Sequence, residues 1–116
     1  MRALIAGCVA VILTGTAALA DPVGKYTVAG TNPGGGSSYS GTVTVQKTGD
    51  TYKVTWNIAG TQYNGTGVGN DEFIAVSYTS GGNTGLALFG AEGDEWKGIW
   101  TYANGTKVGT ENWTKK

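Results

Sequence analysis

The stretch TYKVTWNIAGTQYNGTGVG, residues 51–69, contains the pattern that decides the fold. Its first half alternates apolar with polar side chains, which is the period of a β-strand with one buried face. The Gly60-Thr61 pair suits a tight turn, and a second strand-like run then begins, so the stretch predicts an antiparallel hairpin. Four residues of the first strand share one face and should point into the core: Tyr52, Val54, Trp56 and Ile58.

The same period of two extends from Pro22 to the end of the chain, and no stretch shows the period of a helix. Clusters of Gly, Asn and Asp interrupt it, and Asn104-Gly105 is the strongest of the resulting hairpin turns. Eight strands are predicted, over residues 25–31, 39–47, 51–59, 62–69, 72–79, 84–91, 96–103 and 106–114. We therefore expect an all-β fold, a small eight-stranded antiparallel up-and-down β-barrel that is closed or nearly closed.

The composition fits one small, tightly turned domain. The chain has 116 residues, of which 21 are Gly, against an ordinary usage of about 7%. An aromatic residue stands two positions before a glycine in three of the predicted strands, so both face the same side and the ring is expected to cover the glycine. The three pairs are Tyr39 and Gly41, Tyr63 and Gly65, and Trp96 and Gly98.

The first twenty residues are predicted to be a secretory signal peptide. Arg2 is basic, an apolar run extends over residues 3–13, and Ala18-Leu19-Ala20 is a cleavage sequence, so residues 21–116 form the exported domain. Ile5-Ala6-Gly7-Cys8 also fits a lipoprotein cleavage box, but an anchor at Cys8 is disfavoured, because its apolar segment would be only five residues long and more apolar residues follow the cysteine. We expect a periplasmic or secreted protein without a membrane span, since the apolar run is too short for one.

The exported domain lacks the side chains on which most enzymes depend. It contains no His, Cys or Arg, and its seven Lys against eight Asp and Glu give a net charge of −1. Catalysis, cofactors, a metal site and nucleic-acid binding are therefore not expected. The acidic turn at residues 92–95 is interpreted as a solvated loop tip, since the spacing of a calcium-binding loop is missing.

Three features remain as candidate sites. The first is the only long connection predicted, which has the composition of a flexible linker. It is either a passive loop or a segment that becomes ordered on a protein partner. Its residues are Asn32, Pro33, Gly34, Gly35, Gly36, Ser37 and Ser38. Aromatic side chains either fill the barrel or form a pocket at one mouth, the pocket candidates being Trp56, Trp100, Tyr102 and Trp113. Trp113 shares its face with Gly109 and Glu111. The strand at Phe73–Val76 is apolar on both faces, so one of them is a candidate contact surface.

Three segments carry a resemblance to a known family: residues 39–42 (YSGT), 98–101 (GIWT) and 109–113 (GTENW). Through them the chain resembles a largely uncharacterised family of small, signal-bearing exported proteins of Gram-negative bacteria. Some members of that family are described as fibronectin-binding protein. The resemblance implies an exported barrel and transfers no binding residue. The architecture is also similar to that of lipocalins and avidin-like barrels, but the lipocalin G-x-W motif lies in the first strand, whereas Gly98-Ile99-Trp100 lies in the seventh.

Taken together, these observations predict an exported, non-catalytic binding module. Its expected partner is a host or envelope protein, with a fibronectin-like matrix protein as the candidate that the resemblance implies. Two alternatives stay open: a carrier of a small apolar ligand that uses an aromatic barrel mouth, and a periplasmic inhibitor of a lysozyme or a protease.

Overall fold

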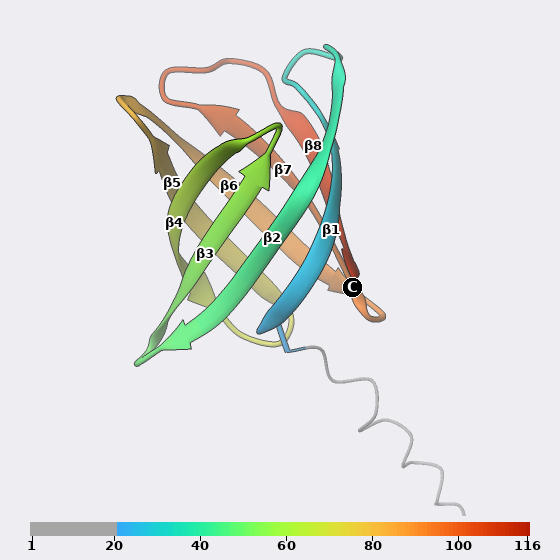
Figure 1. Ribbon diagram of the computed structural model, residues 1–116, viewed down its shortest axis with the longest axis vertical. Coiled ribbons are helices and arrows are strands. Elements are labelled where there is room, and N and C mark those ends of the chain that lie inside the picture. The colour runs from blue at the N-terminus through green and yellow to red at the C-terminus, as the bar shows by residue number, and fades with distance from the viewer. Residues whose placement is uncertain (1–20) are drawn as a thin grey trace, which may run out of the picture.

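The computed structural model describes residues 21–116, and the predicted signal peptide lies outside them. Eight antiparallel strands close into a barrel in which each strand pairs with its neighbours in sequence (Figure 1). The strands are β1 (Gly24–Thr31), β2 (Ser38–Thr48), β3 (Thr51–Ile58), β4 (Thr61–Gly69), β5 (Phe73–Ser80), β6 (Asn83–Glu92), β7 (Glu95–Tyr102) and β8 (Gly109–Lys115). The predicted fold class, an all-β up-and-down barrel, is confirmed, and the barrel is closed.

Closure depends on the pairing of the first strand with the last. β1 pairs with β8 from Tyr26 opposite Lys115 to Thr31 opposite Thr110, so no strand edge is left unpaired. Because consecutive strands alternate in direction, the connections β1–β2, β3–β4, β5–β6 and β7–β8 lie at one end, the top of Figure 1. We call this the upper end. The other three connections and both ends of the described chain lie at the lower end.

The β7–β8 connection differs from the prediction. The strands were expected to meet at a two-residue Asn104-Gly105 turn, but β7 ends at Tyr102 and β8 begins at Gly109. Asn104 does take the positive φ of a turn, at 66°, and the Gly105 N–H donates to the Tyr102 carbonyl. The Thr101 hydroxyl then donates to the Lys107 carbonyl at 2.8 Å, which holds the following residues out of the sheet. The upper end therefore carries two long connections rather than one.

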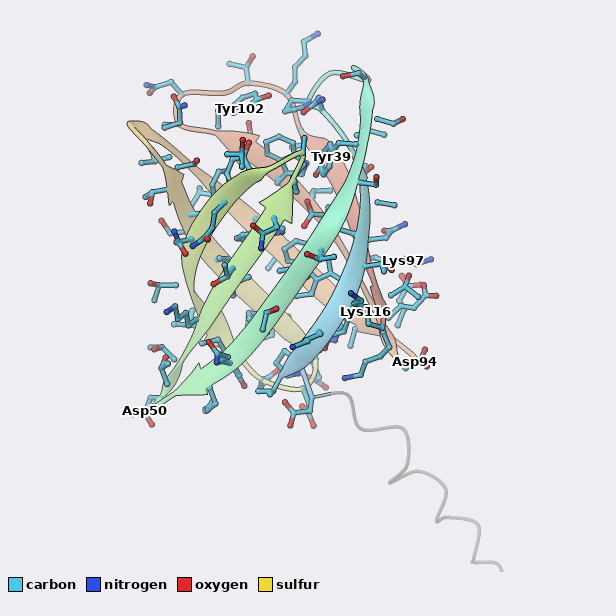
Figure 2. All side chains as sticks on the ribbon, viewed as in Figure 1. Tyr39, Asp50, Asp94, Lys97, Tyr102 and Lys116 are labelled. Atoms are coloured by element: carbon cyan, nitrogen blue, oxygen red, sulfur yellow. The ribbon has the colours of Figure 1, made fainter. Side chains whose placement is uncertain are left out.

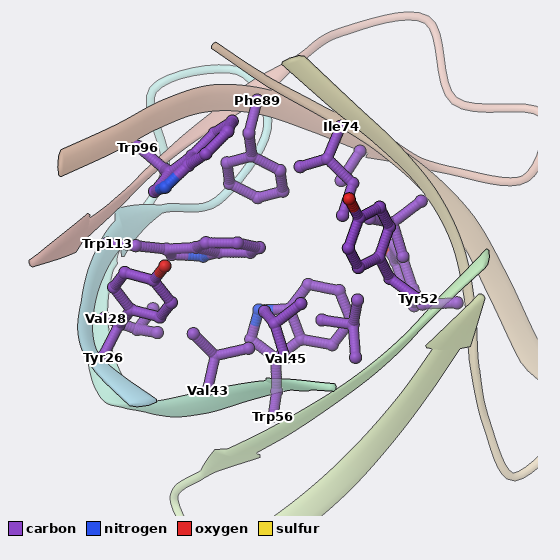
Figure 3. Packing of buried hydrophobic residues seen from close by; sticks show 14 residues of the cluster. Tyr26, Val28, Val43, Val45, Tyr52, Trp56, Ile74, Phe89, Trp96 and Trp113 are labelled. Atoms are coloured by element: carbon purple, nitrogen blue, oxygen red, sulfur yellow. The ribbon is translucent and has the colours of Figure 1, made fainter. Parts of the chain in front are cut away.

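Side chains from every strand except β4 supply the buried apolar cluster that fills the barrel (Figure 3). The inward face predicted for β3 is confirmed, because Tyr52, Val54 and Trp56 are buried and Ile58 is partly buried against them. Trp96 and Trp113 are the largest side chains that are fully buried. The fourteen buried apolar side chains are Tyr26, Val28, Val43, Val45, Tyr52, Val54, Trp56, Ile74, Val76, Tyr78, Ala87, Phe89, Trp96 and Trp113.

Glycines make room for the large rings, but across strands rather than along them. Each of the predicted same-strand glycines, at positions 41, 65 and 98, has its nearest side chain on a neighbouring strand. In four places an aromatic ring lies against the glycine directly opposite it in the ladder, where a Cβ atom would clash with the ring. These pairs are Tyr39 and Gly30, Tyr78 and Gly85, Phe89 and Gly98, and Trp100 and Gly109. Rings do cover glycines, but across strands, so the three predicted same-strand pairs are wrong.

The outer surface carries a row of apolar side chains across four strands. Ile74 and Val76 point inward, whereas Phe73 is exposed and Ala75 is half-buried, so the expectation of one exposed face at residues 73–76 is confirmed. Ala75 stands in register with three outward residues of the adjoining strands, which extend the row across β4 to β7: Val68, Leu88 and Ile99.

Candidate functional site

Aromatic side chains from four strands gather at the upper end of the barrel. We call this group the aromatic mouth; it consists of Tyr39, Tyr63, Tyr78, Trp100 and Tyr102. Trp100 is its centre, with ring centroids 6.0 Å from Tyr39, 6.3 Å from Tyr78 and 5.2 Å from Tyr102, all in edge-on geometry. Tyr63 joins the group through Tyr78 at 6.3 Å. Figure 2 shows Tyr39 and Tyr102 at this end of the barrel.

The aromatic mouth grades from buried to exposed. Tyr78 is buried, and burial raises the pKa of its hydroxyl to about 12. Tyr39, Tyr63 and Trp100 are partly buried against the core, whereas the Tyr102 side chain is 48% exposed. Such a gradient suits a contact surface, because aromatic rings that are already held in place lose little conformational entropy on binding.

A buried carboxylate lies beneath the aromatic mouth. Glu111 of β8 points into the barrel and is only 5% exposed. Its neighbours in the ladder are Gly98 on one side and Gly30 on the other, so no side chain from the adjoining strands competes for the space. Three donors surround the carboxylate: the Tyr39 hydroxyl reaches Oε1 at 2.6 Å, and the Trp56 and Trp113 indoles reach Oε2 at 2.6 and 2.7 Å.

Burial determines the protonation of this group. Loss of water contact raises the pKa of Glu111 above its ordinary 4.5, and the three donors lower it by less. The two oxygens are not equivalent. An indole N–H can only donate, so Oε2 must remain an acceptor, whereas the Tyr39 hydroxyl can either donate to Oε1 or accept from it. A proton on Glu111 therefore belongs on Oε1.

Trp100 supplies a donor that has no hydrogen-bond partner. Its indole nitrogen is buried and stands beside Gly109, where a Cβ atom would approach it to 2.7 Å. Within residues 21–116 it is the one buried side-chain nitrogen or oxygen without a hydrogen bond. Buried donors are normally satisfied, so this unpaired N–H is an exception in the structure.

The two long connections at the upper end contact each other. The β1–β2 connection is ordered by Asn32, whose backbone N–H and side-chain amide both donate to the Ser37 carbonyl, at 2.9 and 3.1 Å. The Gly34 N–H donates to the Val108 carbonyl at 3.2 Å, and the Lys107 chain lies against Gly34. The predicted loop is thus a structured turn tied to its neighbour, and Ser38 already belongs to β2. Its role in binding stays a prediction.

The structure divides the four predicted pocket residues into two pairs. Trp56 and Trp113 are core residues joined through Glu111, while Trp100 and Tyr102 belong to the aromatic mouth. Sequence analysis missed Tyr39, Tyr63 and Tyr78 as members of the mouth, and it gave Glu111 no role. The signal for Glu111 was its place on the inward face with Trp113, since an acidic residue in an inward position needs donors.

Charges are distributed unevenly between the two ends. Glu111 is the one acidic residue of the described chain that does not lie toward the lower end. The other seven do: Asp21, Asp50, Asp71, Glu72, Glu92, Asp94 and Glu95. Within residues 21–116 the one ion pair joins Lys97 to Glu92 at 3.5 Å, and no three His, Cys, Asp or Glu side chains are placed to hold a metal ion. The same part of the chain contains no helix long and apolar enough to cross a membrane.

Comparison of the chain with models of known protein families gives no match, and comparison with curated proteins gives none either.

Proposed function

We propose that the protein is an exported, non-catalytic binding module that contacts a protein partner through the upper end of its barrel. The observation that carries this proposal is the aromatic mouth, placed beside the two long connections at that end. Tyr and Trp are the residues that most often dominate binding energy at protein interfaces. Export is proposed from Ala18-Leu19-Ala20 and the apolar run before it.

The rigidity of the upper end favours binding without rearrangement. The barrel is closed, Trp100 is packed against three other rings, and the Gly34–Val108 hydrogen bond holds the two connections together. A surface that is already ordered avoids much of the entropic cost of binding. As for the partner, a host or envelope protein is proposed, and the family resemblance suggests a fibronectin-like matrix protein.

A second function is a carrier of a small apolar ligand. The mouth offers aromatic surface, but the barrel below it is filled by side chains that are at most 8% exposed. A ligand would therefore rest on Trp100 and Tyr102 rather than enter the barrel. Inhibition of a lysozyme or a protease is the third candidate; there the two connections would enter the enzyme's cleft.

Affinity capture with matched variants tests the leading proposal. The exported domain is immobilised and exposed to envelope extract and to extracellular matrix, and the proteins it retains are identified. Binding of any retained protein is then measured for Tyr102→Leu and for Phe73→Leu, because these side chains are similarly exposed, at 48% and 45%, and lie at opposite ends. The proposal expects at least a tenfold loss for Tyr102→Leu and none for Phe73→Leu. Equal binding by both variants would contradict it.

A further inference from the structure

Within residues 21–116, lysine side chains lie over aromatic rings at the lower end of the barrel but not over the aromatic mouth. At the lower end, Lys47 lies over the Tyr52 ring at 4.8 Å and Lys115 lies over the Tyr26 ring at 4.9 Å. Aromatic rings attract cations in this geometry through their negatively polarised faces. In the described part of the chain, no lysine is placed in this way over the aromatic mouth.

The buried carboxylate is a second reason to expect that a cation binds at the aromatic mouth. Glu111 lies directly under the mouth, its Oε1 bonded to the Tyr39 hydroxyl, and no cation of residues 21–116 pairs with it. When Glu111 is ionised, its buried negative charge is compensated only by neutral donors and stays electrostatically unbalanced. A cation placed on the rings above it would be attracted by the rings and by the carboxylate together.

We propose that the aromatic mouth binds an alkylammonium group above Glu111, presented either by a lysine of the protein partner or by a free organic ammonium ion. The inference rests on the proposed function, because it names the chemistry that the same surface would recognise. Tyr39 links the two parts of the site, since its ring belongs to the mouth and its hydroxyl donates to Glu111. Tyr102 would provide the outer, exposed ring.

Lys107 is the one lysine in the connections of the upper end, and it does not fill this role. Its side chain lies against Gly34 in the neighbouring connection, and it forms no ion pair with Glu111. Its positive charge, carried at the same end of the barrel, would oppose a second cation there. Lys107→Gln should strengthen ammonium binding about twofold, and an unchanged or weaker affinity would contradict the proposed position.

The test compares choline with 3,3-dimethylbutan-1-ol, which has nearly the same shape and no charge. Each is titrated into the exported domain, and the four tryptophan indole N–H signals are followed by NMR. The proposal expects choline to shift the Trp100 signal and to bind at least tenfold more tightly than the alcohol. Equal affinity, or shifts confined to Trp96 near the lower end, would overturn it.

Variants separate the charge from the rings. Glu111→Gln keeps an acceptor for the indoles and removes the charge, so it should reduce the preference for choline at least fivefold. Tyr102→Leu changes an exposed ring and leaves the core intact, so it tests the site even if Glu111→Gln does not fold. It should weaken choline binding at least threefold, whereas Phe73→Leu should leave it unchanged. Choline affinity that Tyr102→Leu leaves unchanged would overturn the proposal.

Two peptides identify the source of the ammonium group. Acetyl-Gly-Lys-Gly-amide carries an ammonium group on its lysine, and in the same peptide with that lysine acetylated a neutral amide replaces it. Binding of choline and of the charged peptide, but not of the acetylated one, supports a lysine of a protein partner. Binding of choline but of neither peptide supports a free ammonium ion. Failure here is distinct from failure of the proposed function: a partner captured through Tyr102, with choline and the alcohol equal in affinity, would refute the ammonium site alone.

Discussion

The hydrogen bonds of Glu111 lead to a prediction about stability. Replacing Glu111 by leucine puts an apolar side chain of similar size in its place. The replacement removes the hydrogen-bond acceptor of Tyr39, Trp56 and Trp113. The Tyr39 side chain is only partly buried, whereas the two indoles are buried and would be left without a partner.

The expected magnitude follows from the number of orphaned donors. A buried donor without a partner costs about 1 to 3 kcal/mol. Two indoles therefore predict a loss of about 2 to 6 kcal/mol for Glu111→Leu, a large share of the roughly 5 to 15 kcal/mol that stabilises a typical domain. Glu111→Gln retains an acceptor for the indoles and should cost about 1 kcal/mol.

Urea unfolding of a double-mutant cycle measures the effect. Trp56→Phe removes one indole donor, so it should cost about 1 to 3 kcal/mol less in the Glu111→Leu background than in the parent. Tyr52→Phe is the control, because Tyr52 lies at the lower end of the barrel and does not contact Glu111, and its effect should add within about 0.5 kcal/mol. Simple additivity of Trp56→Phe and Glu111→Leu would refute the account of the Glu111 site.

Three further predictions concern pH, glycine packing and the upper connection. Because burial raises the pKa of Glu111 above 4.5, the folded chain binds the proton of the Glu111 carboxyl more tightly than the unfolded chain does. The stability that this protonation contributes is complete below about pH 4.5 and is lost as the pH rises through the folded pKa. Glu111→Gln should remove this fall in a series of urea unfolding curves, and an identical pH dependence in both proteins would contradict it. Gly85→Ala, whose Cβ would clash with the Tyr78 ring, should lower the melting temperature by several degrees, whereas Gly82→Ala, which meets open space, should not; equal melting temperatures would contradict the packing. Replacing residues 33–37 with a two-residue turn should cost about 1 kcal/mol or less by thermal unfolding, because their hydrogen bonds are exposed, and a larger loss would show that the connection supports the barrel.

The fold could be predicted because its signals are local. Alternation in residues 51–58 fixes which side chains face inward, and hairpin turns fix the order of the strands. The β7–β8 connection could not be predicted in the same way. Asn104-Gly105 does form a turn, but whether the chain re-enters the sheet at Thr106 or at Gly109 depends on hydrogen bonds such as that of Thr101 to Lys107, which are tertiary.

The candidate site could be predicted only in part, because it too depends on tertiary contacts. Alternation places Trp100 and Tyr102 on one face of a strand, but only the closed barrel shows that Trp56 and Trp113 lie below them. The group around Glu111 joins residues 55 and 72 positions apart in the chain, so no spacing motif connects them. The cross-strand pairing of rings with glycines likewise depends on register, which the local pattern leaves open.

The central claim is that the protein meets its partner through the upper end, and site-specific photo-cross-linking tests it most directly. Tyr102 and, separately, Phe73 are replaced by p-benzoylphenylalanine in cells that produce and export the protein, and adducts are detected after irradiation. The two positions are almost equally exposed and lie at opposite ends of the barrel. The account predicts a discrete protein adduct from position 102 and none from position 73. A discrete adduct from position 73 alone would contradict it and would point to the apolar row outside β4 to β7.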